Sequence, residues 1–363
     1  MKYSKEELLL IWLDSFIGLD RKLKLDLYES AVVSDGIKNM VSKSRDYIIS
    51  ASNKNVYENL IASANDGYLK FLLDGYNRKG IVAVTIESSA YPETLRNISI
   101  PPLVLYAKGD VGLLKSKCFS VVGSRKSLPS SINVAENYAS ALCASGFTLV
   151  TGIAEGVDTA VITKTLELKG KVISVLAGGH SNVYPASNIA LANKVEESGL
   201  TISEYPPEVK AMPYFFPIRN RIIAGLSLGT LVVSGGVKSG TIHTARYAEE
   251  FGKDLFVIPY GVGVASGAGC NELIKMGGML TDTPDDILEF YGEQKKEKIS
   301  LSAEEKEICT LLLDGERHIE YICANLGKKI YEVSPIISIL EIKGVISKNG
   351  SNVYGLLQTD LED

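Results

Sequence analysis

The spacing of hydrophobic and polar positions changes twice along the chain. From residue 3 to about 75, apolar residues such as Leu9, Trp12 and Phe16 recur near a 3.6-residue period, which predicts amphipathic helices. From residue 81 the pattern changes to short runs rich in β-branched residues and bounded by Gly and Pro, which predict strands. We therefore expect a small helical domain, followed by a domain built around a sheet.

The central part of the chain alternates apolar strands with helical runs. This alternation predicts a mainly parallel sheet with helices on both faces, which is a doubly wound α/β fold. The predicted strands are residues 118–122, 147–150, 172–176, 200–203, 230–233 and 255–258.

The last part of the chain has a pattern of its own. Residues 293–299 form a charged linker. Helical patterns then cover residues 303–313, 319–326 and 330–343. After them, two predicted strands flank an Asn349-Gly350 turn. Three helices followed by such a hairpin are typical of a winged helix. The predicted domains are residues 1–78, 79–292 and 300–363, with 293–299 as the linker.

Composition narrows the class of protein. The 363 residues carry a net charge of -5 and the pI is near 5.5, so a nucleic-acid site would have to be a local basic patch. No apolar run reaches the roughly 18 residues that a membrane span needs, and the N-terminus lacks the uncharged core of a signal peptide. We expect a cytoplasmic protein without a membrane partner.

Motifs for metals, cofactors and catalysis are missing from the sequence. The cysteines form no C-x-x-C pair and the histidines show no ligand spacing, which argues against a metal site. Neither G-x-G-x-x-G nor G-x-x-x-x-G-K-[ST] occurs, so no nucleotide cofactor is expected. No catalytic Ser-His-Asp or Cys-His set can be assembled, and we expect a binding protein rather than an enzyme.

Candidate binding residues follow the predicted strands, because ligands of this fold collect at the carboxyl ends of its strands. Gly123-Ser124-Arg125-Lys126 follows the strand 118–122, and its backbone N–H groups and Arg side chain suit a phosphate. The alternative is a tight turn alone. Lys238 precedes Ser239-Gly240-Thr241 at a helix start, where phosphate binding and simple N-capping are both open.

The stretch from Phe216 to Arg221 sets two guanidiniums at a predicted helix N-terminus. Pro217 suits the first helical turn, and the free N–H groups there favour an anion. Arg219 and Arg221 could bind phosphates or instead form structural salt bridges, and Asn220 is expected to fix them by a hydrogen bond. Phe216 could stack on bases, although packing is the commoner role of such an aromatic residue.

Several of these motifs stand in the order and spacing of a known family. Most of residues 80 to 290 resemble the DNA-processing protein family DprA/Smf, and the Arg219-Asn220-Arg221 motif is specific for it. The motifs that carry the resemblance are Gly123-Ser124-Arg125, Thr151-Gly152 to Asp158, Tyr184-Pro185, Ser203-Glu204-Tyr205-Pro206, Phe216 to Ser227, Ser239-Gly240-Thr241 and Gly269 with Asn271.

The resemblance implies an extended Rossmann-like core that binds single-stranded DNA without base specificity. It also implies homodimers, loading of the recombinase RecA during natural transformation, a SAM-like helical N-terminal domain and a winged-helix C-terminal domain. With the strand-end argument, the expected DNA-binding residues are Gly123, Ser124, Arg125, Lys126, Gly152, Phe216, Arg219, Asn220, Arg221, Lys238, Ser239, Gly240 and Thr241.

This chain departs from the family pattern at three places. Ser234 stands where the family usually has Glu, Tyr260 replaces the Gly of a Pro-Gly pair, and Val161 replaces a His. Two other functions stay open: a Rossmann-like nucleotide or nucleoside hydrolase, which needs a carboxylate for the ribose where Ser234 stands, and a scaffold that binds protein partners only.

Overall fold

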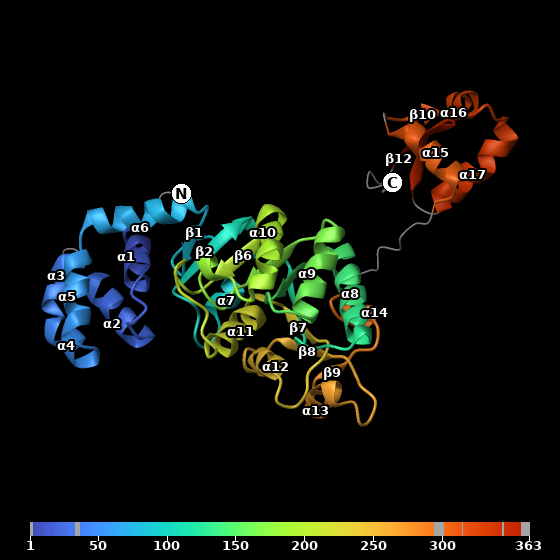
Figure 1. Ribbon diagram of the computed structural model, residues 1–363. Helices are drawn as coiled ribbons and strands as arrows, with labels where there is room; N and C mark the ends of the chain where they lie inside the picture. The colour runs from blue at the N-terminus through green and yellow to red at the C-terminus, as the bar shows by residue number, and fades with distance from the viewer. Residues whose placement is uncertain (1–2, 33–36, 294–300, 314, 343–344, 357–363) are drawn as a thin grey trace. The chain divides into compact units, whose positions relative to one another are not determined.

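The computed structural model describes residues 3–32, 37–293, 301–313, 315–342 and 345–356 (Figure 1). The chain divides into two compact units, Met1–Lys295 and Lys296–Asp363. Apart from Glu293, the predicted linker 293–299 lies outside the described residues. No helix in the described ranges is long and apolar enough to cross a membrane.

The first unit begins with helices, as the 3.6-residue pattern predicted. Trp12 is fully buried at their centre, and its indole Nε1 donates to the Ser63 carbonyl oxygen at 3.1 Å. A capping box at Ser4 begins the first helix, and Asn53 and Asn65 cap two later ones. The helices are α1 (Lys5–Asp14), α2 (Arg21–Val32), α3 (Ile37–Lys43), α4 (Arg45–Ala51), α5 (Lys54–Ser63) and α6 (Asp66–Arg78).

A nine-stranded sheet follows, in the order β1-β2-β6-β5-β4-β3-β7-β8-β9. The strands from β6 to β9 in that order are parallel, whereas β1 and β2 pair antiparallel at one end. The predicted mainly parallel sheet is thus confirmed. The strands are β1 (Val82–Thr85), β2 (Val104–Gly109), β3 (Cys118–Val122), β4 (Thr148–Thr151), β5 (Val172–Val175), β6 (Leu200–Ser203), β7 (Gly229–Val232), β8 (Asp254–Val257) and β9 (Met279–Leu280).

Helices cover both faces of this sheet (Figure 1). On one face pack α7 (Glu93–Arg96), α11 (Phe215–Leu226), α12 (Thr241–Glu250) and α13 (Ala268–Lys275). On the other face pack α8 (Pro129–Ala144), α9 (Val157–Glu167), α10 (Ile189–Ser198) and α14 (Pro284–Phe290). The central strands β3, β4, β5, β6 and β7 are buried along their whole length, so their sequences are mostly apolar, which is why they could be found without an alternating pattern.

The N-terminal helices pack against the antiparallel end of the sheet. Leu10 and Ile11 of α1 share a buried cluster with residues of β1 and β2. The Tyr106 hydroxyl of β2 donates to Asp14 Oδ2 at 3.1 Å, and Lys24 of α2 forms an ion pair with Asp14 Oδ1 at 2.8 Å. The helical segment therefore covers the β1 edge of the sheet, and the proposed domain boundary near residue 78 stays a prediction.

The second unit contains three helices and a small antiparallel sheet in the order β10-β12-β11. Its elements are α15 (Ala303–Leu312), β10 (Arg317–His318), α16 (Ile319–Leu326), α17 (Ile330–Ile342), β11 (Ile346–Gly350) and β12 (Val353–Leu356).

The hairpin turn of this unit differs from the prediction. We predicted the turn at Asn349-Gly350, but β11 continues through Gly350, which pairs with Val353. The turn lies at Ser351-Asn352, where Asn352 adopts the left-handed conformation with φ 60°. Asn tolerates this conformation better than most residues, so a second Asn three positions along the chain serves the turn instead.

Candidate nucleic-acid interface

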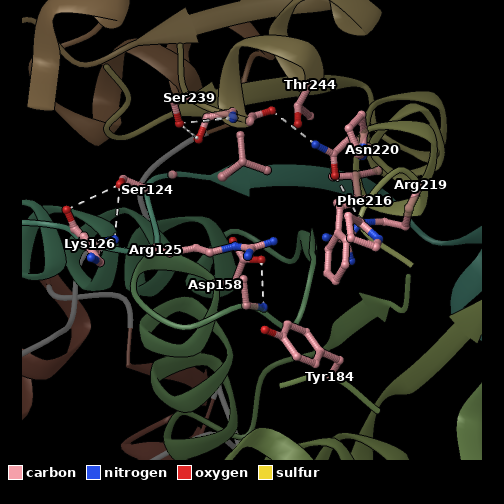
Figure 2. Close-up of a pocket in the computed structure, with 18 of the residues that line it drawn as sticks. Ser124, Arg125, Lys126, Asp158, Tyr184, Phe216, Arg219, Asn220, Ser239 and Thr244 are labelled. Atoms are coloured by element: carbon pink, nitrogen blue, oxygen red, sulfur yellow. Dashed lines mark hydrogen bonds between the residues drawn. The ribbon is translucent and has the colours of Figure 1, made fainter. Parts of the chain in front are cut away.

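A cavity of about 740 Å³ opens at the carboxyl ends of the central strands. It is formed by the connections after β3, β4, β5, β6 and β7 and by α11 and α12 (Figure 2). β3 lies between β4 and β7. From β3 the chain adds β4, β5 and β6 on one side, and it then returns to add β7, β8 and β9 on the other side. This is the topological switch point at which ligands bind in doubly wound sheets.

The cavity gathers most of the residues that the sequence predicted. Gly152, Arg221 and Lys238 are not part of its lining. The predicted residues that line it are Gly123, Ser124, Arg125, Lys126, Phe216, Arg219, Asn220, Ser239, Gly240 and Thr241.

The loop after β3 is held by buried hydroxyl groups. The Ser124 backbone N–H donates to Ser234 Oγ at 3.1 Å, and the Ser127 and Ser234 hydroxyls bond each other at 2.9 Å. Ser234 is fully buried at the end of β7. Nearby, the Tyr260 hydroxyl donates to the Val233 carbonyl oxygen at 2.8 Å. Two departures from the family pattern, Ser234 and Tyr260, thus support the walls of the cavity.

Replacing Ser234 by alanine is expected to lower the free energy of unfolding by about 1–3 kcal/mol, because the partly buried Ser124 N–H loses its acceptor and the fully buried Ser234 hydroxyl is removed. Urea unfolding measures the change. Ser140→Ala is the matched control, since the Ser140 hydroxyl only donates to a carbonyl of its own helix. Equal stabilities of Ser234→Ala and the wild type would contradict the anchoring role of Ser234.

Two exposed cations stand at the cavity. Arg125 and Lys126 are both solvent-exposed, and the Arg125 guanidinium lies over the Phe216 ring, 4.9 Å from its centroid. Tyr184 packs edge-on against the same ring, with the centroids 5.6 Å apart. Tyr184 was missing from our predicted site residues, although its Tyr-Pro motif was part of the family resemblance. The cations and the rings together can bind a phosphate and an adjacent base.

Arg219 lies at the floor of the cavity and is buried. Its guanidinium donates to the Val175 carbonyl oxygen at the end of β5 and, through Nε, to Asn220 Oδ1 at 3.0 Å. Asn220 in turn donates to the Gly240 carbonyl oxygen at 3.3 Å. Asn220 was predicted to fix both arginines by a hydrogen bond, and in the structure it accepts one from Arg219. Its own bond to Gly240 connects α11 to the loop before α12.

Arg221 faces away from the cavity lining. Its buried guanidinium forms an ion pair with Glu204, which follows β6. The salt-bridge alternative describes this side chain in the structure, and phosphate contact by Arg221 stays a prediction. The side chains of Arg219 and Arg221 point in different directions because residues two positions apart lie on different sides of a helix.

The start of α12 lies at the cavity. Its N-cap is Gly240, without a capping side chain, so Ser239 and Thr241 are not the caps that the sequence suggested. The Thr241 N–H donates to Ser239 Oγ at 3.3 Å, and Ser239, Gly240 and Thr241 line the cavity, where phosphate binding stays a prediction. Lys238 is exposed just before them. Across the described ranges, no group of His, Cys, Asp or Glu side chains is placed to hold a metal ion.

Gly152 has a steric role in this arrangement. A Cβ at Gly152 would lie 2.7 Å from one terminal nitrogen of Arg219 and closer still to Asp158 Oδ2. Contacts this short do not occur in proteins, so any side chain at this position would push the carboxylate and the guanidinium out of place. Gly152 therefore makes room for the charged floor of the cavity.

The fold and the cavity define a class: doubly wound α/β proteins, in which ligands bind at the switch point of the sheet. A family model described as DNA recombination-mediator protein A matches residues 82–292. DNA processing protein DprA of Bacillus subtilis (strain 168) is 36% identical over 252 residues, which are 69% of this chain and 83% of that protein. The chain belongs to the DNA-processing DprA/Smf family.

Solved structures of two relatives share the fold. DNA processing protein A from Streptococcus pneumoniae superposes with a TM-score of 0.68 at 28% identity, covering 81% of this chain and 99% of that one. DNA processing protein A from Helicobacter pylori, whose structure concerns its single-stranded DNA binding mode, superposes with a TM-score of 0.53 at 26% identity. That match covers 58% of this chain and 95% of the other.

Proposed function

We propose that this chain binds single-stranded DNA through the cavity at the carboxyl ends of β3, β4 and β7. The observation that carries the proposal is the position of Arg125 and Lys126, two exposed cations beside the aromatic rings of Phe216 and Tyr184. Cations bind the phosphates, and rings accept any base by stacking. A paired base cannot offer its face to a ring, which favours a single strand over a duplex. The DNA-binding relative from Helicobacter pylori supports the same ligand.

Binding of this kind does not depend on base identity. The lining offers guanidinium, ammonium, backbone N–H and hydroxyl groups and ring faces, together with the Asn220 amide and the buried Asp158 carboxylate. Phosphate contacts and stacking carry little sequence information. We therefore propose a binding role in DNA uptake and recombination rather than catalysis.

The proposal extends to the partners that the family resemblance implies, RecA and a second copy of the chain. For the homodimer, a supporting feature is the β9 end of the sheet, where Met276, Leu280 and Phe290 are exposed. Exposed apolar residues beside an edge strand are typical of protein interfaces. Loading of RecA onto the bound strand rests on family membership alone.

We further propose a SAM-like domain for the N-terminal helices and a winged helix for the second unit. The second proposal is supported by the three helices α15, α16 and α17 and by the hairpin of β11 and β12. Helix–helix–helix–hairpin order is the order of a winged helix. Neither feature says what this unit binds.

A gel shift with single-stranded and double-stranded oligonucleotides of equal length tests the proposed function. We expect the single strand to bind more tightly, with equal affinities for oligo-dT and mixed sequences at fixed salt. Adding RecA is expected to give a slower-migrating complex on the single strand. Preference for the duplex, or the release of free base from nucleoside monophosphates, would contradict the proposal.

A further inference from the structure

The loop between β3 and α8, residues 123–128, carries Arg125 and Lys126 exposed at the cavity. Arg125 reaches toward Phe216 (Figure 2), and α8 begins after Leu128 without a capping side chain. A loop that is disordered before binding loses backbone freedom when a phosphate fixes its cations, and this loss weakens binding. The contacts that order this loop therefore bear on its affinity for DNA.

A closed ring of hydrogen bonds, the serine ring, holds the loop at Ser124 and Ser127. The Ser124 N–H donates to Ser234 Oγ at 3.1 Å, and the Ser127 hydroxyl donates to the Ser124 carbonyl oxygen at 2.9 Å. The hydroxyl oxygens of Ser127 and Ser234 are 2.9 Å apart. Because Ser127 gives its proton to the carbonyl, Ser234 is the donor between the two hydroxyls. The ring ties the loop to Ser234, which is fully buried just after β7.

A second set of bonds, the tyrosine relay, holds the start of α8. The Tyr260 hydroxyl donates to the Val233 carbonyl oxygen at 2.8 Å, so the buried Ser131 is the donor in its own 2.8 Å bond to Tyr260. Val233 directly precedes Ser234, so the serine ring and the tyrosine relay both end at the same place beside β7. The two exposed cations of the loop lie between these two points of attachment.

We infer that the serine ring and the tyrosine relay position Arg125 and Lys126 for phosphate before DNA arrives, with Ser127 and Tyr260 as positioning residues. The inference rests on the proposed binding of single-stranded DNA and adds what makes the site ready for it. Neither Ser127 nor Tyr260 lines the cavity, so both act through the loop and not by touching the strand.

Hydroxyl groups suit this task because each member of the two sets accepts one hydrogen bond and donates another. An ionised carboxylate only accepts, and it would also place a negative charge beside the phosphates. Ser234 and Tyr260 are two of the three departures from the family pattern, and the structure gives them one shared role. The loop is ordered without an anion that repels the strand.

The test removes one hydroxyl from each set. Ser127→Ala opens the serine ring and Tyr260→Phe breaks the tyrosine relay, while both cations stay in place. Tyr291→Phe is the matched control, because Tyr291 is half-buried like Tyr260 and its hydroxyl donates to Asp254 Oδ2 at 2.7 Å. Asp254 begins β8 and so lies at the opposite end of the strands from the cavity. Ser127→Thr keeps a hydroxyl and serves as the rescue variant.

Binding of oligo-dT, followed by fluorescence anisotropy over a series of salt concentrations, is the first readout. We expect Ser127→Ala and Tyr260→Phe to weaken binding by about threefold each and by about tenfold together. The slope of log K against log salt should match the wild type, because no phosphate contact is lost. Tyr291→Phe should bind as the wild type does, and Ser127→Thr should restore the affinity that Ser127→Ala loses.

Trypsin cleavage after Arg125 and Lys126, identified by the masses of the fragments, is the second readout. When opening is fast relative to cleavage, the rate of proteolysis follows the population of the open loop. The double variant should therefore be cut at these two positions about tenfold faster than the wild type. Tyr291→Phe should be cut there at the wild-type rate, which separates opening of the loop from a general loss of stability.

A wild-type affinity or a wild-type cleavage rate in the double variant would overturn the inference. A shallower salt slope would overturn it as well, because it would mean that a phosphate contact has been lost instead. If the double variant does not fold, Tyr260→Phe tests the tyrosine relay by the same two readouts. A wild type that does not bind oligo-dT would contradict the proposed function, and faster cleavage in the variants would then still support the ordering of the loop.

Discussion

Replacing Arg125 and Lys126 together by alanine is expected to weaken oligo-dT binding by about 10- to 100-fold at moderate salt, because two phosphate contacts are lost. The slope of log K against log salt should become shallower by about 1.4, twice the single-strand value for one contact. Fluorescence anisotropy across a series of salt concentrations measures both quantities.

The exposure of both side chains makes this variant informative. Arg125 and Lys126 are exposed, so their removal should leave the stability of the fold nearly unchanged. Lys22 and Lys194 are also exposed and lie outside the cavity lining, and their double alanine variant is the matched control. A wild-type salt slope in the Arg125 and Lys126 variant would show that the strand binds elsewhere.

Replacing Arg221 by alanine is expected to lower the free energy of unfolding by about 3–5 kcal/mol, because Glu204 loses its buried partner. We expect the lower end of this range, since Arg21 of α2 also attracts Glu204. Arg246→Ala in α12 removes an exposed guanidinium and should change the stability by less than about 0.5 kcal/mol. Denaturant unfolding followed by circular dichroism compares the three proteins.

The two possible roles of Arg221 give opposite results. A structural ion pair predicts a large loss of stability, and the salt slope of any DNA binding by the folded fraction should stay as in the wild type. A phosphate contact predicts a small loss of stability and a shallower slope. A stable Arg221→Ala protein with a shallower slope would contradict the structural role.

Much of the fold could be predicted because the residue patterns that specify its strands and helices are local in the sequence. The central strands of the sheet are buried on both faces, so they are short and mostly apolar runs, and the helices between them follow the 3.6-residue period. The antiparallel pairing of β1 and β2 at one end of the sheet depends on contacts between distant residues, and so does the order of the strands. No local pattern records these contacts. The hairpin turn was misplaced for a related reason: Asn349-Gly350 and Ser351-Asn352 both suit a turn, and the pairing of β11 with β12 selects between them.

The site could be predicted in part. The small and polar residues after β3 and β7 signalled a cavity, because the carboxyl ends of parallel strands meet at one edge. Tyr184 lines the cavity from the connection between β5 and α10, beyond the residues that directly follow the strand, so the strand-end argument did not include it. Gly152 was among the expected DNA-binding residues, and the structure adds that it leaves room for two side chains from other elements.

By itself, the sequence determined the kind of sheet, the family, and the presence of an Arg-Asn-Arg motif at a helix start. Only the tertiary structure decided what each arginine contacts. Arg219 donates to the Val175 carbonyl oxygen at the floor of the cavity, and Arg221 forms an ion pair with Glu204 outside it. The reason is that a helix directs residues two positions apart to different neighbours, and those neighbours come from strands far away in the sequence. The charge that a guanidinium can offer to DNA depends on these partners.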